Sequence, residues 1–350
     1  MNPSDIISLR LVNQQIAGSK FSSAQGVVEW MGAMQAQDLS MVMWAIGIRL
    51  PGSTERSVES ALTNGKILRT HLMRPTWHLV RAEDIYWMLD LTAPQIRQVL
   101  KSRHKRLGLT GKAVSRSLAV AIAALEGGKN LSRKELTLEF VKAGFPTTDN
   151  MMAHLLVNAE LEGVICSGTV NGSEQTYTLL HNKVPIRKTL HREEALAKLA
   201  KKYFYSHGPA TLRDFAWWSG LSMKDAKEGL EMNRPELTSE TCGEEIYWLA
   251  RSPTIDQQPK NTTWLLPSYD EMIISYRDRS AFLSAGNQKR PISSNGIFRP
   301  VILVNSEVSG IWKKTEKNGR EHIGTELFRP HSQKELINID KAIKRVTDFY

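Results

Sequence analysis

Apolar positions along this chain alternate between the 3.6-residue spacing of amphipathic helices and the shorter runs that are typical of strands. The pattern predicts three successive segments, over residues 6–80, 115–180 and 192–250, in which three helices precede a β-hairpin. In the first segment we expect helices at 6–17, 24–34 and 56–64 and strands at 67–73 and 76–80. In the second we expect helices at 117–125, 133–143 and 150–162 and strands at 163–167 and 175–179, around the turn Asn171-Gly172. In the third we expect helices at 193–206, 212–219 and 223–231 and strands at 237–241 and 245–250, around Cys242-Gly243.

Sequences that resemble capping boxes precede several of these helices, because a hydroxyl is followed three residues later by an acid or an amide. They lie at 22–25, 132–135, 211–214 and 222–225. Residues 81–106 join the first two segments and are predicted to be helical, with basic side chains toward the end.

The end of the chain follows a different pattern. Apolar, β-rich runs lie at 261–267, 298–304, 308–313 and 321–328, with a polar turn at 317–320, a helix expected at 337–345 and a last strand at 346–350. Three helices followed by a hairpin is the order of a winged helix, a helix-turn-helix with a β wing. We therefore predict a mainly α fold with β wings: tandem winged-helix units at residues 1–90, 91–190 and 191–250 and a small C-terminal β-rich domain at 251–350.

Positive charge is concentrated in one stretch. The chain holds 46 Lys and Arg against 36 Asp and Glu, a formal charge of +10. Residues 95–134 contain ten Lys or Arg and one acid, Glu126, a net charge of 10 − 1 = +9. A clustered basic surface favours nucleic-acid binding through counterion release, whereas the alternative is a solvated helix face. A membrane surface fits less well, because Leu100 and Leu107 are too few to form a broad apolar face.

Several classes of protein are disfavoured. Cys166 and Cys242 are too few for a disulfide framework or a structural zinc site, and they fit a reducing compartment. The first residues do not resemble a signal peptide, and the apolar run at 119–125 is far shorter than the ~20 residues that span a bilayer. No phosphate-cradling, dinucleotide-binding or nucleophile-elbow motif is present. We expect a cytoplasmic protein without a metal or a cofactor and without a membrane partner.

Residues 34–39 read Met-Gln-Ala-Gln-Asp-Leu and are predicted to lie at the end of a helix. Spacing alone says little about such a stretch, because a polar helix terminus whose amides cap carbonyls has the same composition.

The sequence resembles the AlkZ-like winged-helix DNA glycosylases, which excise alkylated bases, over most of its length. Five blocks in the same order carry the resemblance: 34–38, 74–80, 208–221, 265–270 with 276–279, and 299–304 with 310–312. Two departures stand out: Pro75 replaces a small residue, usually Gly, and 305–307 read Asn-Ser-Glu where a short Asp-Gly-like turn is common. Pro75 bears on substrate fit, whereas the second departure changes a loop.

The resemblance implies that Gln35 and Gln37 are the catalytic pair. Asp38 follows them and either supports positive charge on the sugar or acts as the base; the alternative is a helix C-terminal or loop acid. On the first hairpin, alternation places Thr76 and His78 on one face. His78 is a candidate to contact a phosphate or orient Gln37, and the alternative is a core histidine satisfied by backbone.

Two neutral amides suffice chemically if the base already carries a positive charge, as in guanine alkylated at N7 or adenine alkylated at N3. Such a base leaves without a strong general acid. The protein must then hold a water and stabilise an oxocarbenium-like sugar, which positioning and oriented dipoles achieve. A Gln carbonyl can accept a hydrogen bond from water.

Further residues are candidates for contact with the DNA backbone. Arg69 and Arg74 flank the predicted hairpin, with a solvated wing as the alternative. The basic stretch supplies the others: Arg97, Lys101, Arg103, Lys105, Arg106, Lys112 and Arg116. We expect Trp217-Trp218 to be core and Asp270 to pair with Arg277 or Arg279.

The leading hypothesis is a monofunctional DNA glycosylase that acts as a monomer on alkylated or crosslinked double-stranded DNA. The alternative is a non-catalytic winged-helix DNA-binding protein or transcriptional regulator, which a sequence-dependent footprint would reveal. RNA binding is a third hypothesis, which competition between duplex DNA and RNA would separate. The preferred lesion does not follow from the sequence.

Overall fold

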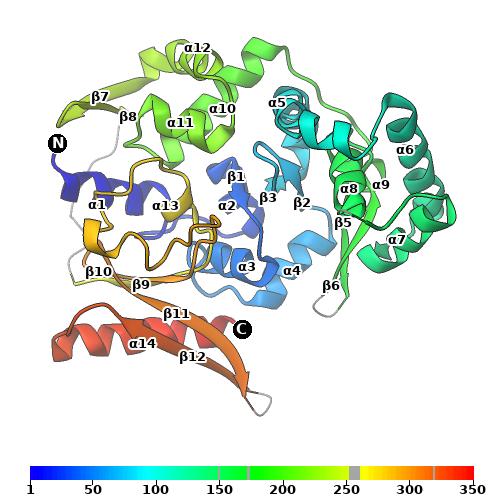
Figure 1. Ribbon diagram of the computed structural model, residues 1–350. Helices are drawn as coiled ribbons and strands as arrows, with labels where there is room; N and C mark the ends of the chain where they lie inside the picture. Colours follow the sequence, from blue (N-terminus) through cyan, green and yellow to red (C-terminus); the bar gives the residue numbers. More distant parts are fainter. Residues whose placement is uncertain (149, 172–173, 252–260, 318–319) are drawn as a thin grey trace. The chain divides into compact units, whose positions relative to one another are not determined.

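The computed structural model describes residues 1–148, 150–171, 174–251, 261–317 and 320–350. The chain divides into two compact units (Figure 1). Unit 1 comprises Met1–Val58, Ala197–Trp218 and Ser222–Tyr350, and unit 2 comprises Glu59–Leu196 with Ser219–Leu221. Helices predominate, with small antiparallel sheets, as the sequence predicts.

Unit 1 opens with the helices that precede and follow the Gln motif in the sequence. They are α1 (Pro3–Asn13), α2 (Ala24–Met31), α3 (Leu39–Gly47) and the start of α4 (Glu55–Thr63), with the short strand β1 (Ala33–Gln35) between α2 and α3. The helix predicted at 24–34 ends early, because Gly32 adopts φ 79° at its C-cap. The Gln motif therefore begins within the strand β1 and leads into the helix α3, and its predicted place at a helix end is wrong.

The middle of the chain adds three helices and a hairpin, in the predicted order. These elements are α10 (Arg192–Ser206), α11 (Leu212–Ser219), α12 (Met223–Asn233), β7 (Leu237–Cys242) and β8 (Glu245–Ala250). The two strands pair antiparallel from Leu237 opposite Ala250 to Cys242 opposite Glu245, which confirms the third predicted hairpin.

The C-terminal part of unit 1 contains a four-stranded antiparallel sheet in the order β12-β11-β10-β9. Its elements are β9 (Thr263–Leu266), α13 (Glu271–Ile274), β10 (Val301–Val304), β11 (Glu307–Lys317), β12 (Arg320–Leu327) and α14 (Gln333–Phe349). The last strand predicted at 346–350 is wrong. Ile339, Ala342, Val346 and Phe349 are buried at helical spacing, so α14 continues to Phe349.

Unit 2 begins with a hairpin and continues with a helical layer around a second small sheet. Its elements are β2 (Ile67–Leu72), β3 (Thr76–Arg81), α5 (Ile85–Arg106), α6 (Gly111–Leu125), β4 (Leu131–Ser132), α7 (Arg133–Lys142), α8 (Met151–Leu161), β5 (Ile165–Asn171), β6 (Glu174–Leu179) and α9 (Leu180–Lys183). The β4-β6-β5 sheet is antiparallel. Parts of the turns predicted at 171–172 and 317–320 lie outside the described residues.

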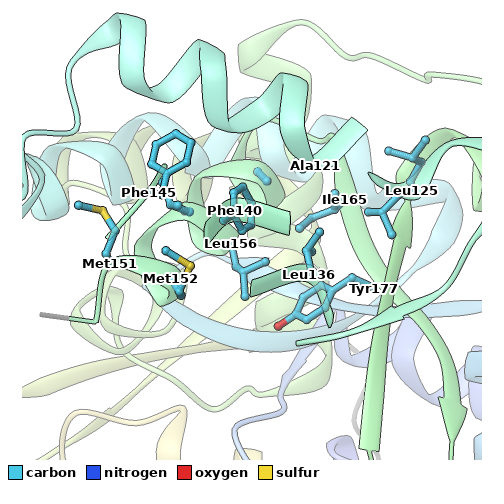
Figure 2. Close-up of a cluster of buried hydrophobic side chains, with 13 residues drawn as sticks. Ala121, Leu125, Leu136, Phe140, Phe145, Met151, Met152, Leu156, Ile165 and Tyr177 are labelled. Carbon is cyan, nitrogen blue, oxygen red and sulfur yellow. The ribbon is translucent and has the colours of Figure 1, made fainter. Parts of the chain in front are cut away.

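A hydrophobic core holds α6, α7, α8 and the β5–β6 hairpin together (Figure 2). Phe140 lies at its centre and is fully buried. Its ring meets that of Phe145 edge-on, with centroids 5.9 Å apart. This core fixes the second helix-and-hairpin segment, and with it α6, which carries part of the basic stretch.

No single helix among the described residues is long and apolar enough to cross a membrane; only the pair Ala82–Arg106 and Gly111–Gly128, bent by 103°, meets the length and composition criteria together.

Candidate functional site

The Gln motif occupies the connection between β1 and α3 in unit 1. Gln35 is the last residue of β1 and is buried, with 5% of its surface exposed. Gln37 and Asp38 are exposed in the turn that follows. The two candidate glutamines thus differ in environment, one held in the protein interior and the other facing solvent.

Asp38 is the N-cap of α3. Its Oδ1 accepts a hydrogen bond from the backbone N–H of Met41 at 3.1 Å. Asp38 therefore begins a helix and is not a helix C-terminal acid, whereas its place in the turn agrees with the alternative of a loop acid. This hydrogen bond fixes the position at which the turn that carries Gln37 ends and α3 begins.

A buried carboxylate accepts a hydrogen bond from the backbone of Gln35. The backbone N–H of Gln35 donates to Oε1 of Glu271, the first residue of α13, at 2.5 Å. Oε2 of Glu271 accepts from Trp218 Nε1 at 3.0 Å and from the hydroxyl of Ser275. Glu271 is 1% exposed, so its charge depends on these donors.

Glu271 stays ionised in spite of its burial. Burial alone would raise its pKa, but hydrogen bonding to the nearby His207, the Ser275 hydroxyl and the Gln35 N–H together lower the pKa to about 2. Nε2 of His207 lies 3.5 Å from Oε2 of Glu271. Burial lowers the pKa of His207, whereas the neighbouring Glu271 carboxylate acts in the opposite direction.

A second buried carboxylate, Asp270, anchors the same helix. Its two oxygens accept from the guanidinium of Arg49 at 2.8 and 2.9 Å, and both side chains are fully buried. The remaining Arg49 donors bind Gln14 and the carbonyl of Ala45, which ties α1, α3 and α13 together.

The predicted partners of Asp270 are wrong. The backbone N–H of Arg277 donates to Asp214, and Nε of Arg279 donates to the carbonyl of Ile273. Trp218 is fully buried, as predicted for core, whereas Trp217 is 41% exposed.

In unit 2, Thr76 and His78 lie on β3. His78 is buried, and its Nδ1 lies 3.0 Å from the carbonyl of Thr76. A hydrogen bond from the ring to a backbone carbonyl is what we expect of a histidine in the core. Gln35 and Gln37 belong to unit 1, so a role for Thr76 and His78 beside them stays a prediction.

The environment of Arg69 does not fit the predicted phosphate contact. Only 6% of its surface is exposed. Its guanidinium donates to Gln175 and lies 4.2 Å from the ring centroid of Trp77, so it is engaged inside unit 2. Arg74 lies half-buried in the turn between β2 and β3.

The basic stretch of unit 2 divides into anchored and free side chains. Arg97 pairs with Glu162 at 3.0 Å, and Arg116 donates to the carbonyl of Ala143 with its guanidinium 4.5 Å from the Phe145 ring. Arg103 is half-buried at the end of α5. The other four of the seven cations in this stretch that are predicted to contact DNA are exposed and, within the part of the chain that the structure describes, have no carboxylate at ion-pair distance: Lys101, Lys105, Arg106 and Lys112. We call these four the basic surface.

Among the described residues, no group of three or more His, Cys, Asp or Glu is arranged to hold a metal ion. The residues that the sequence did not single out are Glu271 and Arg49. A signal for Glu271 was its place directly after the block at 265–270, and a signal for Arg49 was a charge at the end of an apolar run.

Comparisons with known proteins agree with the resemblance. The interstrand DNA cross-link repair glycosylase of Streptomyces sahachiroi is 23% identical over 322 residues, which cover 88% of this chain and 86% of that protein. The solved structure of the Streptomyces sahachiroi DNA glycosylase AlkZ superposes with a TM-score of 0.83 at 20% identity, covering 99% of this chain and 96% of that one. A family model described as DNA glycosylase AlkZ-like matches residues 28–349, which include the Gln motif, the hairpins and the C-terminal sheet. The chain therefore belongs to the AlkZ-like DNA glycosylase family.

Proposed function

We propose that this DNA glycosylase hydrolyses the N-glycosidic bond of purines that alkylation at N7 or N3 has made cationic, with Gln35 and Gln37 as the catalytic pair. The observation that carries the proposal is the motif at the β1–α3 connection, where the Gln35 backbone is held by a buried carboxylate and Gln37 is exposed. A fixed backbone next to an accessible carboxamide suits a reaction that depends on positioning.

The two glutamines need only position the water and stabilise charge on the sugar. The cationic base departs as a neutral molecule, so no acid is needed to protonate it. The carboxamide oxygen of Gln37 accepts a hydrogen bond from the attacking water, and the amide dipoles stabilise the developing charge on the sugar. Asp38 adds a carboxylate next to Gln37 that favours a positive sugar.

Crosslinked DNA is a second substrate that we propose. The Streptomyces relative is named for interstrand cross-link repair, and a purine crosslinked through N7 carries the same positive charge as a methylated one. The turn at Gln37 is exposed, so a bulky adduct has access to it from solvent.

We further propose that the three segments of three helices and a hairpin are tandem winged-helix units, with a β-rich domain at 251–350, and that the protein acts as a monomer. The order of α10, α11, α12 and the β7–β8 hairpin supports this interpretation. A winged helix binds duplex DNA through exposed cations and its wing.

The basic surface makes a testable contribution to DNA binding. Replacing Lys101, Lys105 and Arg106 by Gln should weaken binding to any duplex, independent of sequence. The slope of log K against log salt should fall by about one for each phosphate that the variant no longer neutralises, which fluorescence anisotropy at several salt concentrations measures. The matched control replaces Lys334, Lys341 and Lys344 on α14, also exposed lysines. Equal slopes for both triple variants would place DNA binding elsewhere.

The experiment that tests the function is release of 7-methylguanine from a methylated duplex by the purified protein. Product should accumulate without added metal, and undamaged bases should not be released. A chain that binds duplex with a sequence-dependent footprint and releases nothing would instead be a DNA-binding regulator.

A further inference from the structure

The backbone of Gln35 has an unusual partner. Its N–H, at the end of β1, donates to the carboxylate of Glu271, which lies 236 positions later in the chain. A hydrogen bond to an ionised acceptor is roughly twice as strong as one between neutral groups. Glu271 therefore clamps the backbone of the first glutamine at the point where the strand ends and the exposed turn begins.

The carboxylate itself is held by several donors. Trp218 Nε1 at 3.0 Å and the Ser275 hydroxyl both bind Oε2, which leaves Oε1 directed at Gln35. Each oxygen thus has a defined partner, and rotation of the carboxylate would break at least two hydrogen bonds.

The helix that carries Glu271 is fixed at both ends. At its start, Asp270 caps α13 through the Met272 N–H and pairs with Arg49. At its end, the hydroxyl of Tyr203 donates to the carbonyl of Ser275 at 3.1 Å. The clamp on Gln35 is therefore part of the rigid interior of unit 1.

We infer that Glu271 is a positioning residue for catalysis, which acts through the backbone of Gln35 and sets where the Gln35 carboxamide lies. The inference rests on the proposed function, because it assigns Glu271 a role only if Gln35 is catalytic. Misplacement of a catalytic group by about 1 Å can cost on the order of 10²-fold in rate.

Glu271→Gln is the direct test, because it keeps the volume of the side chain. The new amide group must face either the Gln35 N–H or the donors Trp218 and Ser275, and both orientations place donor against donor. We expect the single-turnover rate of 7-methylguanine release to fall by about 10- to 100-fold, with duplex affinity within about twofold of wild type.

A double-mutant cycle separates positioning from a general loss of structure. Gln35→Ala removes the catalytic side chain and keeps the backbone N–H, so Glu271→Gln should slow this variant no further. A merely structural role would instead multiply the two losses. Glu335→Gln, which changes a half-buried capping carboxylate of α14 in the same unit, is the matched control and should react at the wild-type rate.

The outcomes distinguish the inference from the function it rests on. If Gln35→Ala and Gln37→Ala react like wild type, the proposed function fails. If both are slow but Glu271→Gln reacts like wild type, or its loss multiplies with that of Gln35→Ala, the positioning role fails. Should Glu271→Gln not fold, Ser275→Ala removes one donor to Oε2 and should slow release several-fold with the same non-additivity; additive losses would overturn the inference.

Discussion

Gln37→Ala should lower the single-turnover rate of 7-methylguanine release by about 10²- to 10³-fold, which is the typical cost of losing one oriented polar group that stabilises a transition state. The side chain is exposed, so truncation leaves no cavity and the free energy of unfolding should stay within ~0.5 kcal/mol of wild type. Quench-flow or manual time courses with enzyme in excess over methylated duplex measure the rate.

The control for this variant is Gln333→Ala, an exposed glutamine at the start of α14 that should leave the rate unchanged. If wild-type protein releases no more base than Gln37→Ala, the catalytic assignment of the pair is wrong. Duplex affinity should be the same for all three proteins, because the basic surface lies on unit 2 and is intact in each.

The largest loss of stability should follow from separating Arg49 and Asp270. Arg49→Met and Asp270→Leu should each lower the free energy of unfolding by about 3–5 kcal/mol, since the remaining charge is buried without its partner. The guanidinium of Arg49 donates to Gln14, Ala45 and Asp270 in the protein interior, so no solvent can replace the missing group. Urea unfolding monitored by tryptophan fluorescence measures the effect.

The double variant Arg49→Met with Asp270→Leu should cost clearly less than the sum of the two singles, because it leaves no uncompensated charge. Asp348→Ala on α14 serves as the comparison. Its partner Lys344 and its own side chain are mostly exposed, so little change in stability is expected. If Arg49→Met and Asp270→Leu each lower the free energy of unfolding only slightly, the Arg49–Asp270 pair is not the anchor of α13.

The sequence predicted the local elements well and the long-range contacts poorly. The order of helices and hairpins is confirmed in all three segments, apart from the additional helix α3, because helix periodicity and turn residues are local properties. Helix α3 was missed since Leu39–Gly47 is apolar on nearly all sides and has no polar face to reveal its period. The end of the chain was misread as a strand because Val346 and Phe349 are typical strand residues when viewed without Ile339 and Ala342.

In the candidate site too, local features can be predicted from the sequence and long-range contacts cannot. Gln35 and Gln37 can be proposed from the sequence because the family motif is contiguous, and their catalytic role stays a prediction. Glu271 and Arg49 act through partners 236 and 221 positions away, and no local pattern specifies which buried charge meets which. The expected pairing of Asp270 with a nearby arginine was wrong for this reason: proximity in sequence favoured Arg277, whereas packing of α1, α3 and α13 selected Arg49.

We propose that the leaving base must already be positively charged, because two neutral carboxamides supply no strong acid. The most direct measurement compares base release from two duplexes of the same sequence. One contains 7-methylguanine and the other its neutral isostere, 7-deaza-7-methylguanine, with binding to each duplex measured in parallel. We predict equal affinity for the two duplexes and release from the cationic lesion alone; release of the neutral isostere at a comparable rate would show that catalysis does not depend on the charge of the base.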